Sequence, residues 1–214
     1  MKKSILIILL TVIINVPVSL LFADSDWEFW NHYKTNLNLK NNVAISMAPE
    51  FRFKESLNNY YNHIDIGLDW KISEWISVNA SYRHIFKKQN NRWDQVYCPH
   101  INVKFIRGLN KYNLSNRSRI ELRIINKDSS FRFRNKTTVR LPKLILLHIR
   151  PNLAEEIFYD FQTDRINKNR IYAGVEFPLG KKLGGVIYYI LESSRKENYW
   201  QKINILKLDI KYDV

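Results

Sequence analysis

The 214-residue sequence has little cysteine, glycine or proline: one cysteine and six residues of each of the other two. The single cysteine, Cys98, has no partner for an internal disulfide, so a disulfide scaffold is excluded. The composition is not collagen-like. Aromatic residues make up 14% of the chain, which excludes a disordered tail. The length therefore suits one domain or one extended β-architecture.

Acidic residues are also scarce, with 20 Asp and Glu against 34 Lys and Arg and a formal net charge of +14. A chain that is both basic and aromatic can bind nucleic acid, bind an acidic membrane surface, or enclose its charges. The choice between these depends on where the chain is sent and on how its charges are distributed.

Residues 1–23 have the pattern of a secretory signal peptide. Two lysines precede an apolar run from Ile5 to Phe22, and Ala23 supplies the small residue at the cleavage site. The alternative is a transmembrane anchor, since a run of this length almost spans a bilayer. Pro17 near the end of the run and Ala23 at its exit favour cleavage. We therefore expect residues 24–214 to form one exported domain.

Export changes the interpretation of the charge. Removal of residues 1–23 takes away two lysines and leaves a formal charge of +12. An exported protein does not meet cytoplasmic DNA, so nucleic acid is not an expected partner. No cysteine follows the apolar run, which argues against a lipoprotein anchor.

Apolar and polar residues alternate with a period of two along most of the chain after residue 23. Within residues 43–53, for example, Ile45 and Met47 share one face, and Glu50 and Arg52 share the other. The alternating segments are about ten to twelve residues long, whereas strands of soluble proteins usually have about five or six. A tilted strand that crosses a bilayer needs about 9–11 residues.

This pattern predicts an all-β fold, an antiparallel up-and-down transmembrane β-barrel of 10–12 strands in the outer membrane. A closed barrel leaves no unpaired edge in lipid. Ten strands lie between Val43 and Val214, and residues 27–39 alternate like an eleventh. Because bacterial barrels usually have an even count, either residues 27–39 are not a full wall strand or one strand is missing from the count. The alternative is a soluble barrel of lipocalin type, with its apolar face inside.

The last segment, Leu206 to Val214, resembles the terminal targeting strand of outer-membrane barrels. Val214 stands where a final Phe is usual, and Asp209 stands where that signal usually has Gly. The expected partners are therefore outer-membrane lipid and the barrel-assembly machinery. With a periplasmic C-terminus and short periplasmic turns, the sequence predicts periplasmic turns near 72–74, 107–111, 142–146 and 179–183. It predicts longer external loops near 54–59, 87–93, 125–130, 159–168 and 194–199.

The six tryptophans lie mostly at the ends of these segments. Aromatic residues at both membrane interfaces form a girdle around transmembrane barrels. We therefore expect the following residues to belong to such a girdle rather than to stack on a ligand: Trp27, Trp30, Trp70, Trp75, Trp93 and Trp200.

From Val43 onward, the polar faces carry fourteen basic and seven acidic residues. An Arg that faces lipid near the midplane costs about 2–4 kcal/mol, so these residues should line the lumen. The densest basic block lies on residues 115–123 and 132–140. Apart from Arg134, which belongs to the row described next, its members are Arg117, Arg119, Arg123, Arg132, Lys136 and Arg140, and we expect them to make the lumen basic.

The hairpin spacing predicts a lumenal row of alternating charge across four neighbouring strands: Glu121, Arg134, Glu156 and Arg170. Opposite charges that face each other across strands stabilise a pair by about 0.2–1 kcal/mol. The row can simply hold a narrow lumen together. Alternatively, the electropositive interior binds or passes small anions, because a ring of Arg selects them. A third hypothesis is an outer-membrane enzyme or a binder of acidic lipid headgroups.

The sequence offers little for catalysis. His63 and Asp65 are two residues apart, which is the default spacing of any same-face pair on a strand, and His84 lies on the next segment. His63, His100 and Asp65 do not form a dense set of metal ligands. No Gly-rich phosphate loop is present. We therefore expect no catalytic residues, no metal, no cofactor and no enzymatic activity.

Several motifs, in their order along the chain, resemble those of an uncharacterised bacterial outer-membrane family, domain of unknown function 2490. Residues 116–123 resemble its N-R-x-R-x-E-x-R strand. The remaining matches are Phe131-Arg132-Phe133-Arg134 to its R-x-R strand, Pro151 with Glu156 and Phe158 to its P-x(4)-E-x-F strand, Asn169-Arg170 with Gly174, and Tyr82-Arg83. The resemblance covers nearly all of the mature chain. It implies a barrel in the outer membrane and no assigned activity.

Overall fold

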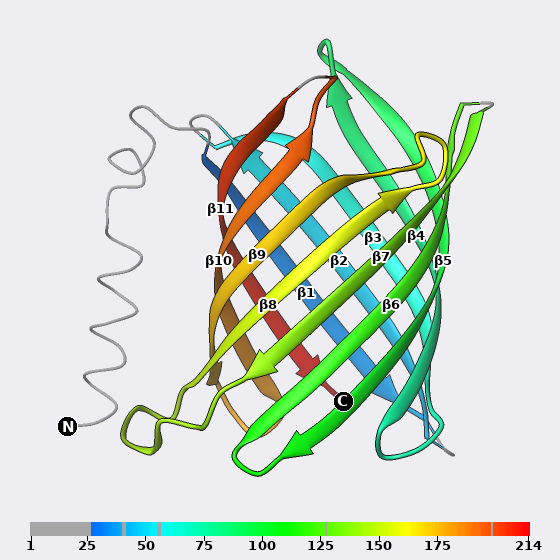
Figure 1. Ribbon diagram of the computed structural model, residues 1–214. Coiled ribbons are helices and arrows are strands. Elements are labelled where there is room, and N and C mark those ends of the chain that lie inside the picture. Colours follow the sequence, from blue (N-terminus) through cyan, green and yellow to red (C-terminus); the bar gives the residue numbers. More distant parts are fainter. Residues whose placement is uncertain (1–26, 40–41, 55–56, 127, 198) are drawn as a thin grey trace.

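The computed structural model describes residues 27–39, 42–54, 57–126, 128–197 and 199–214, which form a closed barrel of eleven strands (Figure 1). The signal peptide predicted at residues 1–23 lies outside the described residues. The strands are β1 (Trp27–Asn38), β2 (Val43–Lys54), β3 (Asn58–Lys71), β4 (Ile76–Gln89), β5 (Arg92–Leu109), β6 (Tyr112–Ile125), β7 (Asp128–Arg140), β8 (Arg150–Asp160), β9 (Arg165–Pro178), β10 (Leu183–Arg195) and β11 (Trp200–Asp213).

The all-β prediction is confirmed, and the period of two explains the shape. The strands have 11 to 18 residues, as β8 and β5 show. Apolar side chains such as Ile66, Leu68 and Ile120 point outward and are half exposed. Charged side chains on the alternate positions, such as Glu121 and Glu156, are fully buried inside. This arrangement is the reverse of a lipocalin-type barrel, whose apolar face lies inside.

The segment at residues 27–39 is a full wall strand. β1 pairs in parallel with β11, from Trp27↔Asn204 to Asn36↔Asp213, and antiparallel with β2. The other neighbours pair in antiparallel fashion. The parallel pair closes an odd number of strands. As a result, β1 begins at the rim opposite to the one where the chain ends (Figure 1).

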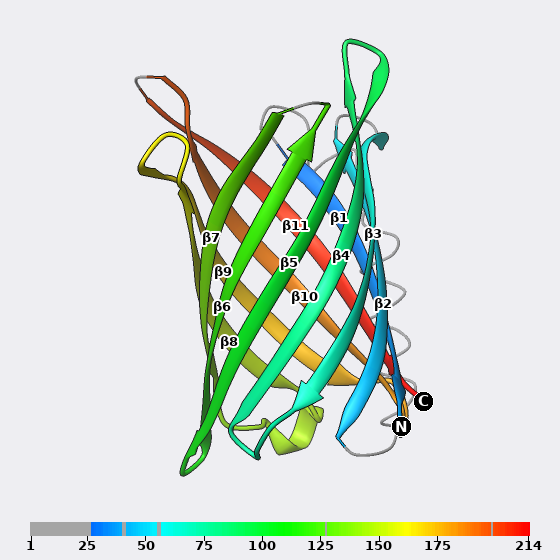
Figure 2. The same cartoon turned by 90° about the vertical axis from the view of Figure 1, so that its right-hand side faces the viewer.

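The connections alternate between the rims as the sequence predicts, but their lengths do not follow the prediction. The longest fully described connection, residues 141–149, lies at the rim of the C-terminus and contains the 3-10 helix η2 (Ile145–Leu147). At the opposite rim, residues 90–91 suffice to join β4 and β5. The reason is that residues expected in external loops continue the strands instead, so the β4–β5 hairpin projects from the barrel (Figure 2).

The outer face also carries a polar patch that the alternation did not predict. Its members, at outward positions of β6 to β9, are Asn116, Ser118, Asn135, Thr137, Glu155 and Asn169. They hydrogen-bond to one another: Asn116 donates to Asn135 and Thr137, and Asn169 donates to Glu155. The outer apolar surface is thus interrupted on this side of the barrel.

Among the described residues, no helix has the length and apolar character needed to span a membrane.

The interior is packed with apolar side chains on the side formed by β1 and β8 to β11. Apolar side chains from β1 and β8 to β11 fill the packed side: Trp30, Ala154, Tyr172, Ile190 and Ile205. Trp30 is only 2% exposed, so its assignment to the outer girdle is wrong. It lies on the face of β1 opposite to Trp27 and Phe29 and points into the barrel. By contrast, Trp70, Trp75, Trp93 and Trp200 are exposed.

Candidate functional site

A cavity of about 900 Å³ occupies the lumen. Its lining extends from Lys54 and Lys196, near one rim, to Lys34 and Arg140, near the other. Eighteen Lys and Arg residues line it, against seven Asp and Glu. All six residues of the predicted basic lumen are among them. The lumen therefore has a large basic excess.

The structure brings the four residues of the predicted charge row into contact. Arg134 bridges the first two acids: its Nη1 lies 2.7 Å from Glu121 Oε1 and its Nη2 lies 2.8 Å from Glu156 Oε1. Arg170 Nη1 lies 3.7 Å from the other oxygen of Glu156. Glu121 and Glu156 are 0% and 1% exposed, so both carboxylates are sealed behind arginines.

The strand register differs from the one used to predict the row. Glu121 lies directly across from Arg132, and not from Arg134. Glu156 lies across from Lys136 on one side and, as predicted, from Arg170 on the other. The two wrong pairings are each displaced by two residues, which keeps the side chains on the same face. The length of the arginine side chain then restores the contacts diagonally.

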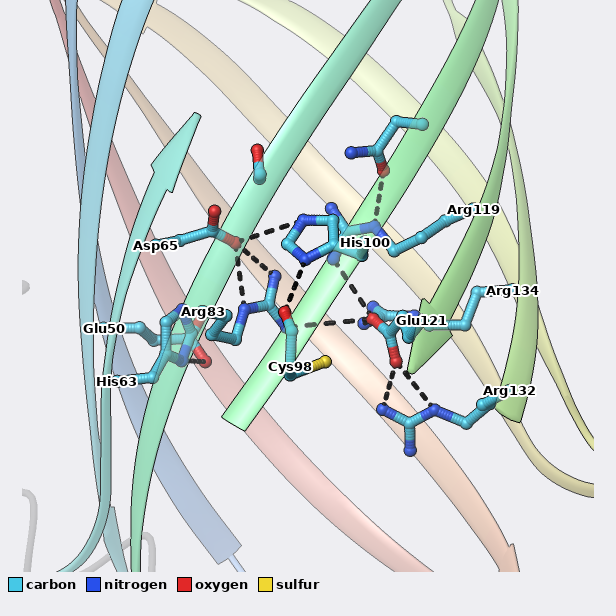
Figure 3. Close-up of polar contacts among 12 residues, drawn as sticks. Glu50, His63, Asp65, Arg83, Cys98, His100, Arg119, Glu121, Arg132 and Arg134 are labelled. Atoms are coloured by element: carbon cyan, nitrogen blue, oxygen red, sulfur yellow. Dashed lines mark hydrogen bonds and ion pairs between the residues drawn. The ribbon is translucent and has the colours of Figure 1, made fainter. Parts of the chain in front are cut away.

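The row is part of a longer series that continues at both ends. Arg83 on β4 lies 3.9 Å from Glu121 and 2.7 Å from Asp65 on β3, and it connects the two acids (Figure 3). At the other end, Arg170 Nε donates to Glu192 on β10 at 2.6 Å, and Lys168 also pairs with Glu192. We call this alternating series the charge belt: Asp65, Arg83, Glu121, Arg134, Glu156, Arg170 and Glu192.

Sequence reasoning missed Asp65, Arg83 and Glu192 as members of this series. A signal for the first two was present, because Asp65 and Arg83 face each other directly across the β3–β4 hairpin. Glu192 lies in a segment, residues 184–193, that is apolar on both faces apart from this end of it. The sequence pattern therefore did not show that the side chain of Glu192 points inward.

Two further groups of inward side chains lie beside the belt: the ion pairs around Glu50, and Trp30 with its two arginines. Glu50 pairs with Arg52 at 2.6 Å and with Lys207 at 3.1 Å, and Lys207 also reaches Asp209 at 3.0 Å. Trp30 lies between two arginines, with the guanidinium carbon of Arg52 3.7 Å and that of Arg170 4.8 Å from the ring centroid. Cation–π contacts of this kind hold arginines over aromatic faces. The tryptophan therefore joins the belt to the Glu50 group.

Two histidines lie beside carboxylates of the same network. His100 Nε2 lies 3.5 Å from Asp65 and His63 Nδ1 lies 3.8 Å from Glu50, whereas His84 faces outward beside Gln95. In the part of the chain that the structure describes, no group of three or more His, Cys, Asp or Glu residues could hold a metal ion. Cys98 is free and buried, next to the belt (Figure 3).

The arrangement can perform two physical tasks. The belt can hold the barrel wall together, because each buried carboxylate is surrounded by cations. The rest of the lumen offers unpaired positive charge beside a cavity, which attracts anions.

The sequence matches the model of the family described as Protein of unknown function (DUF2490) over residues 27–202. The structure is similar to the solved structure of the NanC porin, with a TM-score of 0.51 and 9% sequence identity. The similarity covers 87% of this chain and 99% of the porin chain. At this identity the likeness extends to the barrel fold alone. No curated protein sequence matches this chain.

Proposed function

The chain belongs to the family described as Protein of unknown function (DUF2490), and we propose that it forms an outer-membrane barrel whose basic lumen passes small anions. The observation that carries the proposal is the cavity with eighteen basic and seven acidic lining residues. A low-dielectric wall with an excess of one charge concentrates counter-ions inside the channel. Rings of Arg and Lys select anions in this way.

Placement in the outer membrane is supported by three features. The outward side chains are largely apolar over strands long enough to cross a bilayer. Residues 1–23 have the pattern of a signal peptide, and the C-terminal strand resembles a barrel-targeting signal. The proposed partners are accordingly outer-membrane lipid, the barrel-assembly machinery and small anions. The proposal includes no catalytic step and no cofactor.

Planar-bilayer recording tests the proposal. Mature protein is refolded, its folded state is checked by heat-modifiable gel migration, and it is inserted into a bilayer under a KCl gradient. We expect single-channel currents whose reversal potential indicates preference for chloride over potassium. Absence of current from folded protein, or a preference for potassium, would contradict the proposal.

A further inference from the structure

Three basic residues stand directly opposite one another on adjacent strands. Lys104 of β5 pairs in register with Arg117 of β6, and Arg117 pairs with Lys136 of β7. All three line the cavity. Neighbouring strands are about 4.8 Å apart, so the row extends over roughly 10 Å of the wall. We call these residues the cation row.

The cation row has little acid to neutralise it. Arg117 Nη2 pairs with Glu156 at 2.8 Å, but its Nε is buried and has no hydrogen-bond partner among the described residues. Within the same described ranges, Lys104 and Lys136 form no ion pair. Like charges directly opposite each other destabilise a sheet. The barrel thus retains an unfavourable arrangement in its wall.

Glu156 lies directly across from Lys136 but does not pair with it. One Glu156 oxygen accepts from Arg117 and Arg134, and the other accepts from the hydroxyl of Tyr172 at 2.6 Å. The ammonium of Lys136 instead lies 3.6 Å from the ring centroid of Tyr172. The carboxylate directly across from Lys136 is therefore already occupied.

The wall next to the row provides neutral hydrogen-bonding groups. Ser77 of β4 lies directly across from Lys104, and Asn79 and Ser81 follow on the same face. Ser81 donates to Asn79 Oδ1, so the hydroxyl of Ser77 and the amide N–H groups of Asn79 are the neutral donors that can reach a bound solute without adding charge. A solute held here would meet cations from three strands and polar neutral groups from a fourth.

We propose that the cation row is a binding site for a multivalent oxyanion, either a phosphorylated compound or a di- or tricarboxylate. Several cations on neighbouring strands, which are about 4.8 Å apart, suit a ligand with two or more negative charges better than a single chloride. Phosphate and carboxylate oxygens accept the charge-assisted hydrogen bonds that lysine and arginine donate. The inference rests on the proposed anion pathway, within which the site would slow and select the larger anions.

Calorimetric titration of folded mature protein in detergent with inorganic pyrophosphate, and separately with citrate, tests the site. The double variant Lys104→Gln/Lys136→Gln is expected to weaken binding of at least one probe by about tenfold or more, because two charged hydrogen-bond donors are lost. The matched control is Lys54→Gln/Lys87→Gln. It removes the same charge from lining residues near the rim opposite to the C-terminus, where the β4–β5 hairpin lies. The control should retain the wild-type affinity within about twofold.

Absence of binding of both probes to the wild-type protein would overturn the proposal. Equal weakening in the two double variants would also overturn it, since only the total charge would then matter. Heat-modifiable migration verifies that each variant is folded, and Lys104→Gln alone serves if the double variant is not. Binding without any ionic current would remove the pore and leave the site, whereas chloride current without binding would remove the site and leave the pore.

Discussion

The charge belt and the cation row meet on strands β6 and β7, and they differ there in the supply of acid. On β6 and β7, Arg117 and Lys136 of the row are only two residues from Arg119 and Arg134, which contact Glu121. Two carboxylates serve the arginines of the belt in this region, and each is surrounded by several cations. In the row, Arg117 alone has an acidic partner. The belt therefore stabilises the wall, whereas the row leaves charge available to a solute.

The largest expected effect is on the belt. Glu156→Gln removes a fully buried charge that neutralises Arg117, Arg134 and Arg170. Removal of one partner from a buried ionic network leaves uncompensated charges and costs about 3–5 kcal/mol of unfolding free energy. Urea unfolding of the refolded barrel in lipid, followed by tryptophan fluorescence, measures the change.

The matched control is Glu176→Gln. Glu176 pairs with Arg140 at 2.5 Å, but both side chains are more than one-fifth exposed. Exposed pairs contribute about 0–1 kcal/mol, so this variant should lose little stability. An equal loss in the two variants would show that the belt is no different from an ion pair at the rim.

Trp30→Leu should have an intermediate effect. It removes the aromatic face that holds Arg52 and Arg170 and should lower the unfolding free energy by about 1–3 kcal/mol. The outward-facing Phe131, which is half exposed, provides the control Phe131→Leu. If Trp30→Leu lowers the unfolding free energy less than Phe131→Leu does in the same assay, Trp30 contributes no more than an ordinary packed side chain.

The smallest expected effect has the opposite sign. Lys104→Gln removes one of three like charges that face one another, and should raise the unfolding free energy by about 0.2–1 kcal/mol. Thermal or urea unfolding without added multivalent anion measures this gain. A loss of stability in that condition would mean that Lys104 has a structural partner and belongs with the belt.

The sequence predicted correctly which face of the barrel wall each of these charged residues occupies, but it predicted the pairing register of the strands poorly. Alternation alone placed all six basic lumen residues and the four-residue row on the inward side, because a shift of two residues does not change the face. The register came from assumed loop boundaries, and the real β6–β7 turn is tighter than assumed, with Ile125 already paired to Asp128. Contacts were nevertheless found where predicted, since arginine reaches a diagonal neighbour.

Three other features of the structure were not predicted, each for a different reason. Trp30 was grouped with the outer tryptophans by residue type, although its position in the alternation already set it apart from Trp27. The odd strand count depends on the parallel β1–β11 pair, which joins segments about 180 residues apart and has no local sequence signal. Alternation put Thr137 on the outward face, but it gave no sign that polar residues of four strands gather there as a patch.

The contribution of the cation row to anion selectivity is measured by comparing reversal potentials under a KCl gradient for the wild-type barrel and for Lys104→Gln/Lys136→Gln. We expect chloride preference in the wild type and a clearly reduced preference in the variant, because the variant loses two lumenal charges that form no ion pair among the described residues. Unchanged selectivity in a folded, conducting variant would contradict a role of the cation row in anion selectivity. It would mean that the cation row, like the belt, is only part of the wall.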